Sequence, residues 1–137
     1  MLAVVVDASA TLAWLFGEGD PAAWLEANLS SMKLSAPPLW RLEVVNVIVV
    51  KERRKQITES QGEQFLMILE ALPIAIVPSQ NEQSLLDLAK LARTHQLTAY
   101  DAAYLDLARS EQASLLTLDA NLIDAAQRIN VPLVAMQ

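Results

Sequence analysis

Residues 2–7 read Leu-Ala-Val-Val-Val-Asp, and this short stretch decides the fold class. Its apolar run has no polar alternation, which is typical of a strand that is covered on both faces. A carboxylate follows at once, and residues 8–16 then read as a helix that ends at Gly17. A buried strand followed directly by a helix is the first half of a β-α-β unit, so this stretch predicts a parallel sheet.

The same alternation continues along the rest of the chain. Further short apolar runs predict strands over 33–36, 74–77, 114–118 and 131–135. Helical periods between them predict helices over 21–32, 39–55, 59–72, 81–94, 99–110 and 121–128. Strands that alternate with helices are joined by right-handed crossovers. We therefore predict a single α/β domain over residues 1–137, with three layers, α/β/α, around a central, mainly parallel sheet of about five strands.

Composition excludes several classes of protein. A chain of 137 residues that is 53% hydrophobic can bury a core, which argues against disorder. The absence of cysteine excludes a disulfide scaffold and a thiolate zinc site, and the one histidine, His95, argues against zinc catalysis through histidine. No apolar run approaches the ~20 residues that span a bilayer, and no signal peptide opens the chain, so we expect a cytoplasmic protein with no membrane partner.

The net charge of −6 argues against a general nucleic-acid coat protein, but it leaves a local basic patch or a bridging metal open. Four carboxylates occupy positions where a charge is unexpected. Asp7 and Asp119 each follow a predicted strand, while Glu43 and Asp101 interrupt apolar helical stretches. In open α/β sheets, ligands bind beyond the carboxyl ends of the strands.

These four acids need a neutralising charge if they meet. A lone carboxylate in an apolar segment costs free energy to bury unless it is paired or binds a cation. No lysine is next to any of the four in sequence, so a divalent cation is the natural neutraliser. Oxygen ligands favour Mg²⁺ or Mn²⁺, and such sites usually activate water for phosphoryl-transfer chemistry.

Each acid also has a purely structural interpretation. Asp7 and Asp119 could cap the helices that follow them, and Asp101 lies near a helix start, where the dipole favours an acid. Glu43 could pair with Arg41 or Lys51. Each of these readings is reasonable alone, but together they become less compelling, because two of the acids end strands and two lie near helix starts.

Four segments carry a resemblance to a known family, and they occur in that family's order and spacing. They are Val5–Ser9, Leu39–Asn46, Thr98–Ala108 and Leu116–Leu122. Over its whole length the chain resembles PIN-domain proteins, of the kind that forms the toxin half of VapBC toxin–antitoxin pairs. The resemblance implies a PIN-like α/β/α fold and an endoribonuclease that depends on Mg²⁺ or Mn²⁺.

The resemblance also implies site residues and partners. The acids that match the family's catalytic, metal-binding quartet are Asp7, Glu43, Asp101 and Asp119, and the polar residues that match positions beside it are Ser9, Asn46 and Thr117. The implied substrate is RNA, with tRNA as a family-level expectation. The implied protein partners are a VapB-like antitoxin and a second copy in a homodimer. Two alternatives stay open: a PIN-fold binding or regulatory module without catalysis, and a PIN nuclease without an antitoxin.

A basic cluster lies beyond Glu43 in the same predicted helix, formed by Lys51, Arg53, Arg54 and Lys55. At the helical rise it would lie about 12–18 Å from Glu43, within reach of flanking nucleotides. The cluster, and Arg41 nearer the acids, could therefore bind an RNA backbone. The alternative is a solvated helix end, where the dipole favours basic residues. Two tyrosines flank Asp101, and we expect packing roles for both Tyr100 and Tyr104.

Overall fold

The computed structural model describes residues 1–17, 19–78 and 84–134, with the backbone alone over 19–22. Its described strands form one parallel sheet with the order β3-β2-β1-β4. The strands are β1 Leu2–Val6, β2 Met32–Ala36, β3 Ile74–Ile76 and β4 Ser114–Leu116. The first strand lies inside the sheet, because Val5 is paired with Ser35 of β2 on one side and with Leu115 of β4 on the other.

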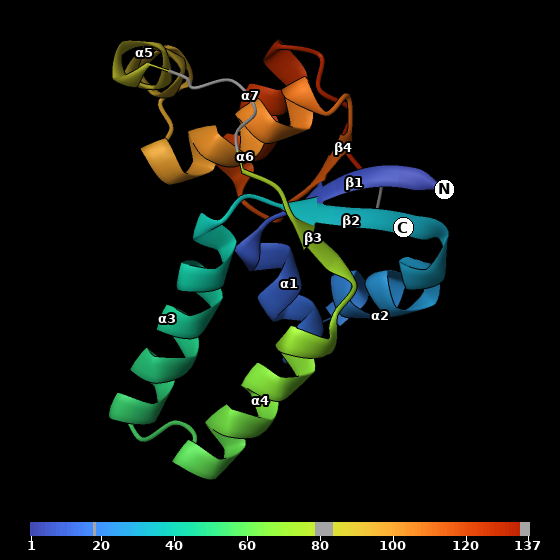
Figure 1. The fold of residues 1–137 in the computed structure, drawn as a ribbon, viewed down its shortest axis with the longest axis vertical. Helices are drawn as coiled ribbons and strands as arrows, with labels where there is room; N and C mark the ends of the chain where they lie inside the picture. Colours follow the sequence, from blue (N-terminus) through green and yellow to red (C-terminus); the bar gives the residue numbers. More distant parts are fainter. Residues whose placement is uncertain (18, 79–83, 135–137) are drawn as a thin grey trace.

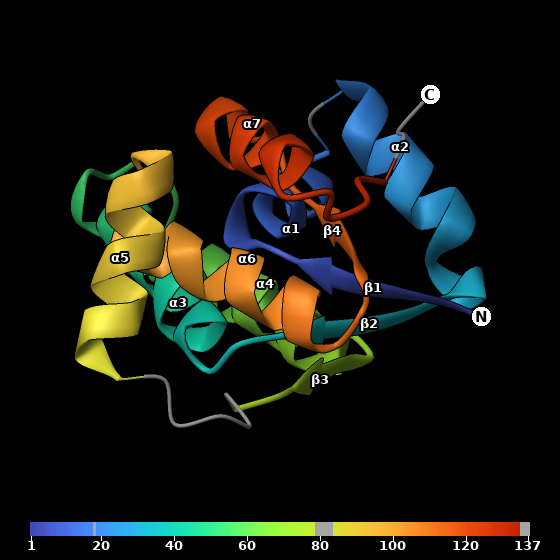
Figure 2. The same ribbon diagram turned by 90° about the horizontal axis from the view of Figure 1, so that it is seen from above.

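Helices cover both faces of this sheet. They are α1 Ala8–Leu15, α2 Gly19–Asn28, α3 Leu39–Arg53, α4 Glu59–Ala71, α5 Leu85–His95, α6 Ala99–Ser110 and α7 Ala120–Arg128, with a 3₁₀ turn over Leu29–Ser31. Figure 1 shows α1 to α4 on one side of the sheet and α5 to α7 on the other, and Figure 2 shows α5, α6 and α7 on the near side. The predicted three-layer α/β/α architecture is therefore confirmed. None of the described helices is long and apolar enough to cross a membrane.

The alternation of side chains along β1 divides the core between the two faces. Val4 and Val6 pack in a cluster with Ala10 of α1, and Val5 packs on the opposite face with Leu105 of α6. All three valines are almost completely buried. A strand that is covered on both faces reads as a continuous apolar run, which explains the unbroken valines of residues 4–6, while Leu2 and Ala3 at the start of the strand are exposed.

The end of the chain differs from the prediction. The predicted strand over 131–135 is wrong, because a single bridge joins Leu133 to Leu115, and residue 135 lies outside the described part. Asn130 turns the backbone with a φ of 59°, and Pro132 has no N–H to donate to a ladder. The described sheet therefore has four strands where about five were expected.

The predicted helix over 81–94 also needs correction. Residues 81–83 lie outside the described part, and α5 begins at Leu85 because the side chain of Ser84 accepts a hydrogen bond from the Asp87 N–H. A serine followed three residues later by an acid is a recognised helix start, so the signal was present in the sequence. The other predicted elements are found with ends shifted by at most a few residues.

Thr58 caps α4 through a reciprocal pair of hydrogen bonds. Its Oγ1 accepts from the Gln61 N–H at 3.1 Å, and its own N–H donates to Gln61 Oε1 at 2.9 Å. We expect Thr58→Ala to lower the free energy of unfolding by about 1 kcal/mol, because an N-terminal N–H loses its acceptor. The melting temperature should fall by about 3–4 °C for a chain of this size, measured by circular dichroism. Thr94→Ala, an exposed change within α5, is the control, and equal melting temperatures for the two variants would contradict the expectation.

Candidate functional site

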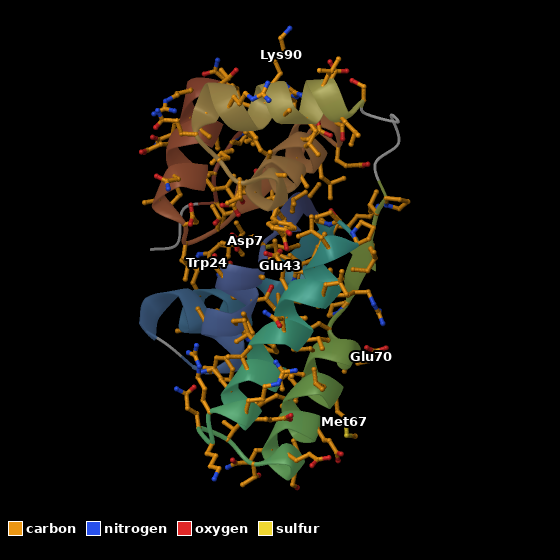
Figure 3. All side chains as sticks on the ribbon, turned by 90° about the vertical axis from the view of Figure 1, so that its left-hand side faces the viewer. Asp7, Trp24, Glu43, Met67, Glu70 and Lys90 are labelled. Atoms are coloured by element: carbon orange, nitrogen blue, oxygen red, sulfur yellow. The ribbon has the colours of Figure 1, made fainter. Side chains whose placement is uncertain are left out.

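Four elements bring the four predicted acids to the carboxyl edge of the sheet. Asp7 directly follows β1, and Asp119 lies three residues after the neighbouring strand β4. Glu43 comes from the first turns of α3, and Asp101 from the first turn of α6. Figure 3 shows Asp7 and Glu43 close together, and repulsion between these two carboxylates helps to raise the pKa of Glu43.

Asp7 is the most firmly held of the four. Only 3% of the residue is exposed, and Oδ1 accepts hydrogen bonds from Ser9 Oγ at 2.7 Å and from the Ala10 N–H at 2.9 Å. Thr117 Oγ1 donates to the other oxygen, Oδ2. Burial raises the pKa of Asp7 above its ordinary value, although these three hydrogen bonds oppose the rise. Asp7 therefore caps α1, as its structural interpretation predicted. The same side chain also belongs to the group of four acids.

Thr117 and Ser9 join the loop after β4 to the end of β1. Thr117 Oγ1 accepts from the Asp119 N–H at 3.0 Å, and Ser9 Oγ accepts from the Leu118 N–H at 3.1 Å. Each hydroxyl thus donates to Asp7 and accepts from the segment that carries Asp119. The two predicted supporting residues set the spacing between two of the acids.

Glu43 has a partner that the sequence did not reveal. The hydroxyl of Tyr104 donates to Glu43 Oε1 at 2.6 Å, and Tyr104 is only 1% exposed. Burial raises the pKa of Glu43, while the Tyr104 hydrogen bond lowers it. The prediction that Tyr104 packs in the core is confirmed by its burial, but it missed the hydrogen bond to Glu43. The same prediction is wrong for Tyr100, which is 64% exposed.

Asp101 and Asp119 are held more loosely. The Asp101 N–H donates to the capping hydroxyl of Thr98 at 3.1 Å, and Asp119 caps α7 by accepting from the Leu122 N–H at 2.9 Å through Oδ1. Burial, together with repulsion from the other three acids, raises the pKa of Asp101 to about 6, although a hydrogen bond from Thr98 opposes the rise. A half-buried carboxyl whose pKa responds to all three others shows that the four charges interact as a group.

The carboxylate oxygens that are not used in hydrogen bonds suit a hard divalent cation. Within the described residues, no hydrogen bond reaches Glu43 Oε2 or Asp119 Oδ2, while the Asp101 carboxylate is hydrogen-bonded by Thr98 alone. In the same part of the chain none of the four acids forms an ion pair. The alternative that Lys51 pairs with Glu43 is therefore wrong, and its Nζ instead lies 4.8 Å from the centre of the Phe16 ring. Free carboxylate oxygens without a nearby cation match Mg²⁺ or Mn²⁺ in kind.

The side chains of the four acids are nevertheless not arranged as a ready set of metal ligands. Among residues 1–17, 19–78 and 84–134, no three acidic or histidine side chains form a ready metal cluster. Like charges repel one another, so four carboxylates need a cation before they can lie against one point.

The other predicted residues line cavities on α3 or lie at the end of that helix. Asn46 lines a cavity of about 280 Å³ along α3 with Lys51 and Arg54. Arg41 lines a second cavity, of about 230 Å³, between α3 and α4. The basic cluster of residues 51–55 ends α3 at the far tip of the α3–α4 hairpin (Figure 1). The structure thus places Ser9 and Thr117 in hydrogen-bond contact with Asp7, whereas no hydrogen bond among the described residues joins Asn46 or the basic residues to the acids.

The raised pKa of Asp101 gives a stability prediction for the metal-free protein. Above pH 6 the folded state must hold Asp101 ionised at a cost that the unfolded chain does not have, so Asp101→Asn should be more stable than the parent at pH 7–8. After discounting for solvent screening of a half-buried group, we expect about 1 kcal/mol, or about 3–4 °C in a thermal melt. The advantage should shrink as the pH falls and vanish below the ordinary pKa of 3.8.

Asp87→Asn is a matched control for this change. Asp87 occupies the same position in α5 that Asp101 has in α6, with its N–H on a capping hydroxyl, but it is exposed. Its replacement should cost a few tenths of a kcal/mol through the helix dipole. A sharp fall in the melting temperature of Asp101→Asn would mean that Asp101 is needed only to start its helix.

Comparisons with known proteins identify the family of this chain. The family model described as PIN domain matches residues 4–128. Ribonuclease VapC3 of Pyrobaculum aerophilum is 31% identical over 129 residues, which cover 94% of this chain and 98% of that protein.

Solved structures show the same fold. PAE2754 of Pyrobaculum aerophilum has a TM-score of 0.65 at 25% identity, covering 90% of this chain and 86% of that one. VapBC2 of Rickettsia felis, bound to a promoter DNA fragment, has a TM-score of 0.66 at 14% identity, covering 98% of each chain. FitAcB of Neisseria gonorrhoeae has a TM-score of 0.66 at 15% identity, covering 96% of each chain. The family match and the full-length relative show that the chain belongs to the PIN-domain family and is VapC-like.

Proposed function

We propose that this chain is a Mg²⁺- or Mn²⁺-dependent endoribonuclease that hydrolyses phosphodiester bonds in RNA. The observation that carries the proposal is the meeting of four carboxylates at one edge of the sheet, with no ion pair to any of them among the described residues. Such a site attracts a divalent cation, and cation sites of this kind serve phosphoryl transfer. The full-length similarity to Ribonuclease VapC3 supports RNA as the substrate.

The four acids would have two roles at the site: one is held in place by hydrogen bonds, and the others complete the ligands of the ion. Asp7, fixed by Ser9, Ala10 and Thr117, is the rigid anchor. The other three acids, Glu43, Asp101 and Asp119, would complete the set of ligands. A bound divalent ion supplies an activated water and offsets charge on the scissile phosphate. Because Ser9 and Thr117 link Asp7 to the segment that carries Asp119, the spacing between these two ligands is constrained before any ion binds.

We further propose that the chain acts as a single PIN-like domain in the cytoplasm, as the toxin of a toxin–antitoxin pair. The VapC-like relative supports this role. In this proposal a VapB-like antitoxin silences the nuclease, the chain forms a homodimer, and tRNA is a target. A nuclease that needs no antitoxin, or a binding module without catalysis, are the alternatives that the next experiment separates.

Cleavage of total cellular RNA tests the proposed activity. Purified protein should produce discrete fragments with Mg²⁺ or Mn²⁺ and none with EDTA, because the acids need a cation to act. Asp101→Asn should lower the rate at least about 100-fold, since it removes a ligand charge. The proposal would be contradicted if the parent protein still produced RNA fragments in EDTA and if Asp101→Asn produced the same fragments. A folded protein that binds Mn²⁺ but cleaves nothing would favour a binding module.

The basic cluster at the end of α3 gives a separate prediction about RNA affinity. Arg53 and Arg54 are exposed at the tip of the hairpin. If they contact phosphates, replacing both with alanine should reduce the slope of log affinity against log salt by about 1.4, or about 0.7 for each charge on a single strand. A fluorescence-anisotropy titration of a labelled single-stranded RNA at several salt concentrations measures this slope.

The control removes two exposed charges elsewhere. Lys90 and Arg93 lie on α5, and Figure 3 shows Lys90 at the opposite end of the molecule from the α3–α4 tip. Replacing both with alanine makes the same change in net charge. Equal slopes for the two double variants would mean that the 51–55 cluster is only a solvated helix end.

A further inference from the structure

The hydroxyl of Tyr104 lies at a junction of three helices beside the acidic site. Tyr104 belongs to α6 and is almost fully buried, and its hydroxyl donates to Glu43 Oε1 of α3 at 2.6 Å. The backbone of Ala8, the first residue of α1, hydrogen-bonds the same oxygen. Because Ala8 follows Asp7 and Tyr104 lies one helical turn after Asp101, the junction lies among three of the four acids.

This junction joins the two helical layers of the fold. Helices α1 and α3 lie on one face of the sheet, and α6 lies on the other (Figures 1 and 2). The bond from Tyr104 to Glu43 therefore crosses from one layer to the other at the edge of the sheet. The ring of Tyr104 packs in the apolar cluster that contains Leu105 and Leu122, so it cannot easily move.

The direction of these hydrogen bonds is well defined. A backbone N–H can only donate, so the Tyr104 oxygen accepts from Ala8, and its own proton is left for Glu43. That proton needs an acceptor, which the ionised carboxylate supplies. The bond uses Oε1 alone, and no hydrogen bond within the described residues reaches Oε2. One oxygen of Glu43 is thus held by the protein while the other stays available.

We propose that Tyr104 is a positioning residue that holds the Glu43 carboxylate in one orientation, with Oε2 free for the divalent cation of the site. The inference rests on the proposed function, because it concerns the same cation. Without the hydroxyl, Glu43 is half-buried on α3 with no other hydrogen-bond partner in the described residues and must be ordered when the ion binds. Groups that orient a metal ligand commonly contribute 10–100-fold to metal affinity.

Binding of Mn²⁺ alone tests the inference without any measurement of activity. The free Mn²⁺ signal in electron paramagnetic resonance gives the dissociation constant of the full-length protein. Tyr104→Phe keeps the buried ring and removes only the hydroxyl, and we expect it to weaken binding about tenfold. Tyr100→Phe removes a hydroxyl from an exposed neighbour in the same helix, and should bind Mn²⁺ as the parent does. Circular dichroism confirms that each variant is folded.

A double-mutant cycle asks whether Tyr104 acts through Glu43. Glu43→Ala should itself weaken binding, and adding Tyr104→Phe to it should then change little. A further tenfold loss in the Glu43→Ala background would overturn the inference, as would equal affinities for Tyr104→Phe and the parent chain. If the parent chain binds no Mn²⁺, both this inference and the proposed metal dependence fail, whereas equal affinities remove this inference alone.

A second variant covers the case in which Tyr104→Phe does not fold. Glu43→Asp keeps the charge and the oxygen donors but withdraws the carboxylate by one methylene from the Tyr104 hydroxyl. Glu43 is half-buried, so this change leaves the core intact. We expect a loss of Mn²⁺ affinity of about tenfold. Unchanged affinity would show that the exact place of this carboxylate is unimportant, and would overturn the inference.

Discussion

Asp7 follows a strand that has parallel neighbours on both sides, and this placement constrains everything else in the site. Parallel strands end on the same edge of a sheet, so the segment after β4 arrives beside Asp7. Three hydrogen bonds then hold the Asp7 carboxylate where the apolar core ends. A buried, hydrogen-bonded carboxylate at a sheet edge is a fixed negative charge around which further ligands can gather.

The other acids gather there at a cost in stability. Burial and mutual repulsion raise the pKa of Asp101 and Glu43, so the folded protein carries charges that the unfolded chain holds more easily. The protein does not relieve this strain with a lysine or arginine ion pair in its described part. Such strain is usual where a fold preserves a site for a ligand, because the ligand supplies the missing charge.

Local patterns predicted most of the fold and the acids of the site. Residues 4–6 are apolar on both faces because this part of β1 is covered on both faces. Thr58 with Gln61 marks the start of α4 through hydrogen bonds between near neighbours in sequence. The strand predicted over 131–135 failed because an apolar run does not show whether its backbone has a full ladder partner. The four acids were recognisable because charges in apolar segments need a reason.

Contacts between distant segments could not be predicted in the same way. Tyr104 and Glu43 are 61 residues apart, and a tyrosine in an apolar helix looks the same whether or not its hydroxyl has a partner. Asn46 lies one turn after Glu43 on α3, and the sequence did not show that it lines a cavity with Lys51 and Arg54. Side-chain direction at a helix surface depends on the neighbouring elements, which only the fold supplies.

The central claim is that the four carboxylates share a divalent cation, and the thermal stability of the full chain as Mn²⁺ is added tests it most directly. An ion that binds only the folded state raises the melting temperature progressively with its concentration. The account predicts this rise for the parent chain at pH 7–8, and a much smaller rise for Asp101→Asn. A melting temperature that does not respond to Mn²⁺, or that rises equally in both proteins, would contradict it.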